Sequence, residues 1–149
     1  MSTVHLEQTP GIPLAVIRRL VRQSELSRVV PECCGLVWNA MRAQQVKAGR
    51  HVALYWDRSI RLEVGVEVSG QFREQDNVVH SSTPAGPVAT VTHFGPYGTL
   101  RTAHDAIHAW CNEQNHQLAG PSWEIYGHWQ DGWNADPSKI RTDVFYLIR

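Results

Sequence analysis

A single carboxylate interrupts an apolar stretch near the end of this sequence. Glu124 stands between Trp123 and Ile125, and the two-residue period of a β-strand puts its side chain on the same face as Tyr126. A carboxylate among aromatic side chains loses hydration, so it needs hydrogen-bond donors or a cation beside it. Such a group can bind a cation, accept a hydrogen bond from a ligand or act as a general base. A solvent-facing or purely structural glutamate is an equal alternative at this point.

The chain is also rich in aromatic side chains that can form flat walls for rings and cations. It has six tryptophans and four tyrosines in 149 residues. About half of the candidates should only pack in the core. The candidates for ligand contact are Trp38, Tyr55, Trp56, Trp123, Tyr126 and Tyr146.

Other side chains that could do chemistry lack the partners that their chemistry needs. His104 and His108 have the i, i+4 spacing of two metal ligands, but no third ligand is near, so we predict a solvated helix rim and no metal site. Cys33 belongs to no CxxC or histidine-paired motif, which favours a reduced core thiol. No phosphate-binding glycine loop or dinucleotide fingerprint occurs, so we expect no cofactor.

Bulk composition argues against several classes of partner. Fourteen basic side chains balance fourteen acidic ones, which disfavours nucleic-acid binding. No apolar stretch approaches the roughly 18 residues of a membrane span, and the N-terminus lacks the pattern of a signal peptide. We therefore expect a cytoplasmic protein whose partner is a small organic ligand, with no membrane or nucleic-acid partner. A second copy of the chain, forming a homodimer, is a further partner that the sequence leaves open.

The elements that must position these residues follow from the hydrophobic periods. Alternating or β-branched runs predict strands, and apolar residues three and four apart predict helices. The helical core faces are expected to be Val30, Cys34, Val37 and Met41, and then Leu100, Ala103, Ile107 and Trp110. In chain order we expect a strand over 14–22, a helix over 28–45 capped by Ser27, strands over 51–56 and 62–68, a polar linker or surface loop over 70–80, a strand over 87–93, a helix over 97–114, and strands over 122–129 and 142–148.

The order strand, helix, strand, strand occurs twice in this series. Ala48-Gly49 precedes one of the strands after a helix and Ala119-Gly120 the other, which gives a shift of 119 − 48 = 71 residues. This shift lays Ala53 over Glu124, Tyr55 over Tyr126 and residues 15–22 over 86–93, and an insertion of about ten residues around 130–139 follows in the second unit. We predict one α+β domain over 1–149 with pseudo-repeats at about 12–70 and 84–149. Its two units should form an antiparallel sheet with two helices and a ligand groove at the pseudo-twofold junction.

Several segments resemble the GyrI-like small-molecule-binding family. They are 93–97 (HFGPY) with the helix that follows it, 119–126 (AGPSWEIY) and 141–146 (RTDVFY), with weaker similarity over 49–68. The resemblance spans about 12–149, and it implies an effector-binding domain like those of drug-responsive transcription regulators. That family has a duplicated strand-helix-strand-strand fold and a glutamate at the centre of an aromatic pocket.

The resemblance assigns roles to particular residues. It carries the role of the pocket glutamate onto Glu124, supports Tyr126 as its neighbour, and matches Tyr97 to the tyrosine of the Gly-Pro-Tyr turn. The last strand lacks the proline that the family often has near its end. Regulators of this kind also join the pocket domain to a helix-turn-helix module, which the segments before Leu14 and after Arg149 do not supply, so we expect no direct role at DNA.

Three functions stay open on this basis. The leading hypothesis is a stand-alone, multidrug-binding protein that sequesters or senses lipophilic, aromatic or cationic compounds. The second is a hydrolase of reactive small electrophiles in which Glu124 activates water and Tyr126 or Tyr55 assists. The third is an interaction protein that inhibits DNA gyrase, which the neutral net charge does not favour.

Overall fold

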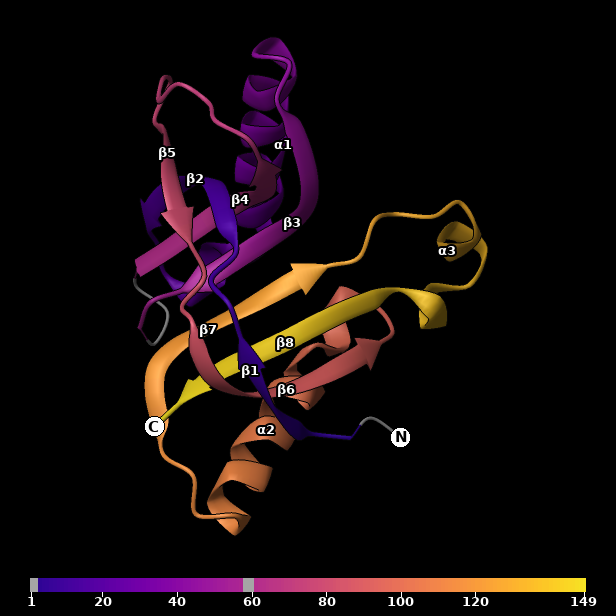
Figure 1. The fold of residues 1–149 in the computed structure, drawn as a ribbon. Helices are drawn as coiled ribbons and strands as arrows, with labels where there is room; N and C mark the ends of the chain where they lie inside the picture. Colours follow the sequence, from indigo (N-terminus) through magenta and orange to yellow (C-terminus); the bar gives the residue numbers. More distant parts are fainter. Residues whose placement is uncertain (1–2, 58–60) are drawn as a thin grey trace.

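The fold is one antiparallel sheet with two long helices, and the α+β class predicted from the sequence is confirmed (Figure 1). The computed structural model describes residues 3–57 and 61–149. The strands are β1 (His5–Thr9), β2 (Pro13–Leu20), β3 (Lys47–Tyr55), β4 (Arg61–Ser69), β5 (Val78–Ser82), β6 (Gly86–Phe94), β7 (Leu118–Tyr126) and β8 (Arg141–Ile148). The helices are α1 (Leu26–Ala43), α2 (Arg101–Glu113) and the single-turn α3 (Gly132–Ala135).

The sheet joins two similar units through their middle strands. The strand order is β1-β6-β8-β7-β3-β4-β2-β5, and every neighbouring pair is antiparallel. Within the sheet order of the described residues, the units β2-α1-β3-β4 and β6-α2-β7-β8 are therefore joined where β3 pairs with β7. In Figure 1 the first unit occupies the upper half of the view and the second the lower half.

Glu124 lies on the pseudo-twofold axis that relates the two units. The register pairs Ala53 with Glu124, Val52 with Ile125 and Leu54 with Trp123. A shift of 71 residues turns the second of these pairs into the third, so a pseudo-twofold axis passes through the Ala53–Glu124 pair. On one side of this axis Ala53 pairs with Val64, and Val64 pairs with Ile17. On the other side Glu124 pairs with Val144, and Val144 pairs with Val91. Ile17 and Val91 are therefore equivalent positions of the two first strands, and their offset is 91 − 17 = 74 residues. The shift of 71 predicted for that strand is therefore wrong by three residues.

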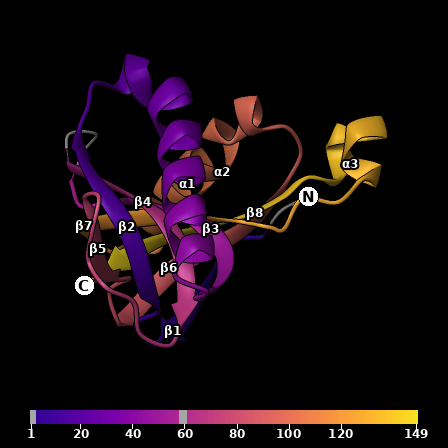
Figure 2. The ribbon, with the colours of Figure 1, turned by 90° about the horizontal axis from the view of Figure 1, so that it is seen from above.

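Both long helices cover the same face of the sheet (Figure 2). Residues that lie directly opposite each other in adjacent strands share a face. One such row across six strands is Val91, Val144, Glu124, Ala53, Val64 and Ile17. Its first two members pack in a core with α2 and its last three in a core with α1. Glu124 is therefore the one polar member of a row that runs beneath the two helices.

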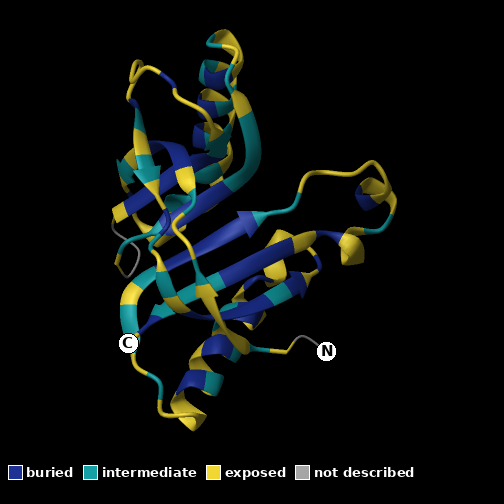
Figure 3. Ribbon diagram, viewed as in Figure 1, coloured by how far each residue is buried: buried dark blue, intermediate teal, exposed yellow. Residues whose placement is uncertain are grey.

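The opposite face carries a core of its own. Seven buried residues form it, namely Leu14, Val16, Val52, Leu54, Val88, Trp123 and Ile125. They come from strands of both units, so the two halves of the sheet curve toward each other on this side. The buried centre of the sheet contrasts with the exposed outer faces of the helices (Figure 3).

The helix faces differ from the prediction by about one residue. α1 buries Val29, Cys33, Val37 and Met41, and α2 buries Ala103, Ile107 and Cys111. Ser27 lies inside α1 and does not cap it, because a 3₁₀ turn (Gln23–Glu25) precedes the helix. Cys34 and Trp110 were expected in the core but are half-buried at its edge. The Cys34 thiol lies within electrostatic reach of Tyr97, which belongs to the second unit.

Three further elements were not expected. β1 lies at an edge of the sheet against β6, although no strand was predicted before residue 14. The predicted polar linker over 70–80 buries Phe72 and runs into β5, the opposite edge strand. The insertion forms α3 and a 3₁₀ turn (Pro137–Lys139), held to the sheet by the buried Trp133. Within the described ranges no helix is both long and apolar enough to cross a bilayer.

Gly65 in β4 should not tolerate a larger residue, because the backbone of β2 lies too close to leave room for a Cβ atom. A Cβ added there would lie 1.7 Å from the Ala15 carbonyl oxygen, whereas one added at Gly35 in α1 would meet nothing within 4 Å. We expect Gly65→Ala to lower the free energy of unfolding by at least about 3 kcal/mol. Gly35→Ala should raise it by roughly 0.5–1 kcal/mol, because alanine favours a helix interior. Urea denaturation measures both, and equal stabilities for the two variants would contradict the β2–β4 register.

Candidate functional site

The carboxylate of Glu124 is buried on the helix-covered face, and side-chain donors that include Tyr126 and His104 hold it. Its residue is 6% exposed, so the solvent-facing alternative is wrong. The Tyr126 hydroxyl donates to Oε1 at 2.5 Å, which the shared strand face makes possible. His104 Nε2 lies 2.6 Å from Oε2 and donates there to the carboxylate. Charge-assisted bonds of this kind offset much of the cost of taking a carboxylate out of water.

His104 occupies a place that the sequence analysis did not predict. It was expected on a solvated rim of α2, yet its side chain is 21% exposed and points to the sheet. α2 packs on β6 and β8 through Ala103 and Ile107, and His104 follows the first of these residues along the helix. The packing of α2 therefore brings the imidazole over β7. No local spacing signals this contact, because 20 residues separate His104 from Glu124.

A short chain of hydrogen bonds continues from the carboxylate through the imidazole to a phenol. His104 Nδ1 lies 2.7 Å from the Tyr146 hydroxyl of β8. The hydroxyl donates to Nδ1 when the imidazole is neutral and accepts from it when the imidazole is a cation. The ring of His108, one turn further along α2, lies edge-on to Tyr146 with centroids 5.0 Å apart. The arrangement Glu124–His104–Tyr146 is thus able to relay or store one proton.

All four tyrosines of the chain gather around this carboxylate. Tyr126 and Tyr146 take part in the hydrogen bonds just described. Tyr55 lies on the same face of β3, opposite Ser122 of β7. Tyr97, in the 3₁₀ turn (Tyr97–Thr99) before α2, meets the Tyr126 ring edge-on at 5.6 Å between centroids and is itself exposed. The tyrosines thus come from β3, β7, β8 and the turn that follows β6.

Burial and the nearby carboxylate hold these phenols in their neutral form. Burial raises the pKa of Tyr126 well above its ordinary value, and the charge of Glu124 raises it further. The same two causes raise the pKa of Tyr55. They also raise the pKa of Tyr146 to about 12. The pKa of Tyr97 is raised first by the partial burial of its ring and then by the Cys34 thiol of α1, which places Tyr97 within electrostatic reach of the first unit.

The predicted tryptophans divide between the two faces. Trp38 of α1 packs on the helix-covered side, and its ring centroid is 5.5 Å from that of His51, which pairs with Tyr126 across β3 and β7. Trp123 and Trp56 belong to the core on the other face, where Trp123 stacks on Phe145 at 5.5 Å. Strand alternation sends Trp123 away from its neighbour Glu124, so it cannot line the same site.

In the described part of the chain, no arginine or lysine forms an ion pair with Glu124. Among the ion pairs of the described residues, the partner of Glu124 is His104. The other buried carboxylates have arginine partners: Glu63 is held by Arg18 at 2.7 Å, and Asp143 lies 3.8 Å from Arg50 and 3.3 Å from Arg141. Glu124 thus differs from the structural carboxylates in having a partner that can lose its charge. No group of three or more metal-ligating side chains occurs in the described part of the chain.

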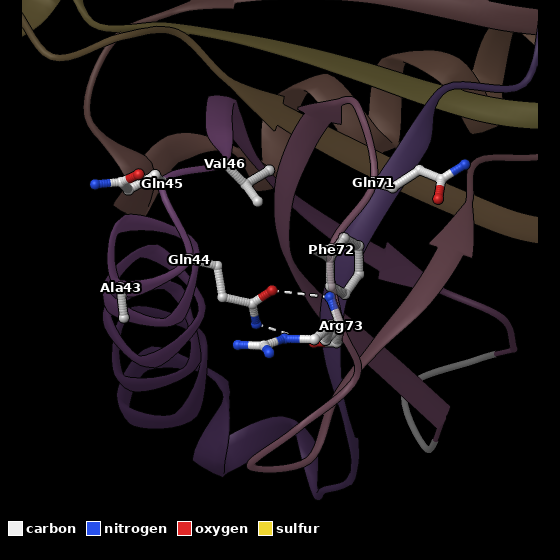
Figure 4. A pocket seen from close by; sticks show the side chains of 7 residues that line it. All are labelled: Ala43, Gln44, Gln45, Val46, Gln71, Phe72 and Arg73. Carbon is white, nitrogen blue, oxygen red and sulfur yellow. Dashed lines mark hydrogen bonds between the residues drawn. The ribbon is translucent and has the colours of Figure 1, made fainter.

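Two surface hollows lie away from Glu124. The larger, of about 430 Å³, sits at the end of α1, where the Gln44 amide donates to the Arg73 carbonyl at 2.9 Å and accepts from its N–H at 2.8 Å (Figure 4). The smaller, of about 290 Å³, lies beside Gly49 and Glu67. Neither includes a residue of the tyrosine cluster. Side chains of the cluster cover Glu124 itself, so a ligand that reached it would have to move them.

The chain belongs to the GyrI-like family, whose small molecule binding domain matches residues 2–149. No curated protein sequence was found to match it. The family resemblance noted in the sequence is therefore confirmed, and with it the general role of a small-molecule-binding domain.

Solved structures share the fold at low sequence identity. The C-terminal domain of EcmrR has a TM-score of 0.81 and 20% identity, over 100% of this chain and 98% of that chain. In a complex of EcmrR with DNA, this chain covers 57% of the EcmrR chain. SAV2435 bound to tetraphenylphosphonium has a TM-score of 0.73 and 11% identity, over 99% and 94% of the two chains. A hydrolase from Listeria innocua has a TM-score of 0.63 and 11% identity, over 98% and 91%.

Removing the charge of Glu124 should be visible in the ionisation of the tyrosines. Wild-type tyrosinate absorbance should appear only above about pH 10, the ordinary value for tyrosine, and Glu124→Gln should bring it to lower pH. Because these folded-state pKa values are raised, the stability that they contribute is complete below about pH 10 and is lost as pH rises beyond it. Ultraviolet titration of the folded protein measures the shift.

The control is Glu113→Gln, an exposed change at the end of α2 that should leave the titration unchanged. Identical curves for wild type and Glu124→Gln, with circular dichroism showing both folded, would contradict the position of the carboxylate among the tyrosines.

Proposed function

We propose that this chain binds lipophilic organic cations between α1 and α2, with Glu124 as the counter-charge. The observation that carries the proposal is a buried carboxylate whose partner is a histidine and not an arginine. A neutral histidine leaves the site with the negative charge of the carboxylate, which attracts a cation strongly where water is excluded. The role of sensing or sequestering such compounds follows from binding without requiring chemistry.

The aromatic side chains around Glu124 supply the walls in this proposal. Tyr55, Tyr126 and Tyr146 lie on the strand faces beside the carboxylate, while Tyr97 and Trp38 lie toward the helices. Each ring that faces a cation adds about 0.5–2 kcal/mol. The tyrosines remain neutral phenols at ordinary pH, because burial and Glu124 raise the pKa of each of the three strand tyrosines. The site therefore gains no second negative charge.

Entry of the ligand requires part of the cluster to move. Tyr97 is exposed, lies in a short turn and packs at a steep angle on Tyr126, so rotation of its side chain is one way to open the cluster. Such rearrangement of side chains on binding is common, whereas the strands beneath can stay in place. The SAV2435 complex with tetraphenylphosphonium supports the choice of a bulky aromatic cation as probe.

The proposal is tested by binding of tetraphenylphosphonium to wild type and Glu124→Gln. Loss of the counter-charge in a desolvated site costs about 2 kcal/mol or more, so the dissociation constant should rise at least roughly 30-fold. Isothermal titration calorimetry measures it, and Glu113→Gln, which changes the net charge equally at an exposed site, should bind as wild type does. Equal affinities for Glu124→Gln and wild type, or no binding by wild type, would refute the proposal.

A hydrolase is the second candidate, favoured by the bonds of Glu124 to Tyr126 at 2.5 Å and to His104 at 2.6 Å. A carboxylate placed between a phenol and an imidazole can take a proton from water while the phenol donates to the leaving oxygen. If it acts so on a reactive electrophile such as an epoxide, Glu124→Gln and Tyr126→Phe should each lower kcat about 100-fold or more. Product analysis checks this, and no turnover of a panel of epoxides and activated esters by wild type would count against the enzyme.

A further inference from the structure

His104 lies where its protonated imidazole would compete with a cationic ligand for the Glu124 carboxylate. Its Nε2 lies 2.6 Å from Glu124, closer than the nitrogen centre of an organic cation shielded by its substituents could come. When His104 is protonated, the pair is neutral as a whole and the imidazolium repels a second cation. When it is neutral, Nε2–H still donates to the carboxylate, and the negative charge of Glu124 is uncompensated.

Tyr146 allows the imidazole to change charge without moving. Its hydroxyl, 2.7 Å from Nδ1, accepts a hydrogen bond from the imidazolium or donates one to the neutral ring. Since its pKa is raised to about 12 by burial and by Glu124, the hydroxyl keeps its proton and can serve in both roles. The 21% exposure of the His104 side chain leaves a route by which its proton can leave to water.

Building on the proposed function, we infer that His104 is the residue that makes cation binding depend on proton release. One proton leaves the His104 imidazolium for bulk water as one organic cation takes its place as the counter-charge of Glu124. The hydrogen bond from Nε2 to the carboxylate survives the exchange. Affinity for cations therefore rises with pH, whereas affinity for a neutral ligand of similar shape does not change through His104.

The other ionisable groups near His104 do not supply this switch. They are Glu124, Tyr126 and Tyr55 from the sheet, Tyr146 from β8, Cys34 from α1, Tyr97 from the turn, and Arg101, Asp105 and His108 from α2 itself. The pKa of Cys34 is raised to about 12 by burial and by Cys33, and those of the tyrosines are raised too, so these groups stay neutral near neutral pH. Arg101 and Asp105 are exposed and lie 3.9 Å apart, so their fields largely cancel and are screened.

His108 offers a matched control on the same helix. It lies four residues after His104, is exposed, and touches the ring of Tyr146 without a bond to Glu124. A histidine that merely added positive charge near the site would act through either position. The inferred exchange acts through His104 and not through His108, because of these two histidines it is His104 that bonds directly to the carboxylate.

The experiment follows binding of tetraphenylphosphonium by isothermal titration calorimetry between about pH 5 and about pH 8, in pairs of buffers with different ionisation enthalpies. In this range histidine is the ordinary side chain that changes charge. Wild type should release close to one proton per ligand at the acidic end, and its affinity should rise about tenfold per pH unit there. Triphenylphosphine oxide, a neutral analogue, should bind wild type with no such pH dependence.

His104→Gln keeps an N–H that can donate to Glu124 but cannot titrate. It should bind tetraphenylphosphonium with an affinity that changes little with pH, releasing almost no proton, and more tightly than wild type at the acidic end. His108→Gln should behave as wild type does. A wild-type affinity that is flat with pH, or a pH dependence that persists in His104→Gln, would overturn the inference and leave the proposed binding function intact. No binding by wild type at any pH would overturn both.

Discussion

The pairing of β3 with β7 is the constraint on which the rest of the structure depends. In the sheet formed by residues 3–57 and 61–149 these strands join the two units, and their register sets Ala53 opposite Glu124 on the pseudo-twofold axis. A slip of one residue would turn Glu124 toward the core of the other face, where Trp123 and Ile125 pack now. The small side chain of Ala53 leaves room above the axis for one large polar group. The duplicated fold thus produces an asymmetric centre, with the charge supplied by the second unit alone.

The buried carboxylate also links the layers of the structure. Tyr126 reaches it from its own strand, and His104 reaches it from α2, which packs on the sheet through an apolar face on either side of that residue. Breaking either bond would leave a charge in apolar surroundings, which is far more costly than the bond itself is worth. The histidine partner also allows the net charge of the site to change, because a histidine can lose its proton whereas the surrounding phenols stay neutral. A site built with arginine, as at Glu63, would be permanently compensated.

Sequence patterns predicted the larger elements because each of those patterns is local. Both long helices, the six main strands and the shared face of Glu124 and Tyr126 follow from periods of 3.6 and two residues. The edge strands β1 and β5 were missed because their sequences are polar, as strands with one exposed side often are. The core face of α1 was misplaced by one residue, since Cys33 and Cys34 fit the apolar period equally well. That choice decides whether Cys34 lies in the core or beside Tyr97.

The sequence by itself therefore determined the fold class and the shared face of Glu124 and Tyr126, because alternation and apolar spacing act over a few residues. It indicated the family through short segments that resemble it, such as 93–97 and 119–126. Only the tertiary structure decided what surrounds Glu124. The hydrogen bond between His104 and Glu124 spans 20 residues and that between His104 and Tyr146 spans 42, so neither can be recognised from local residue spacing. Trp123, adjacent to Glu124 in the chain, is excluded from the site by strand alternation, while His104 is brought to it by helix packing. Proximity in the folded protein depends on the faces that elements turn toward each other, which only packing establishes.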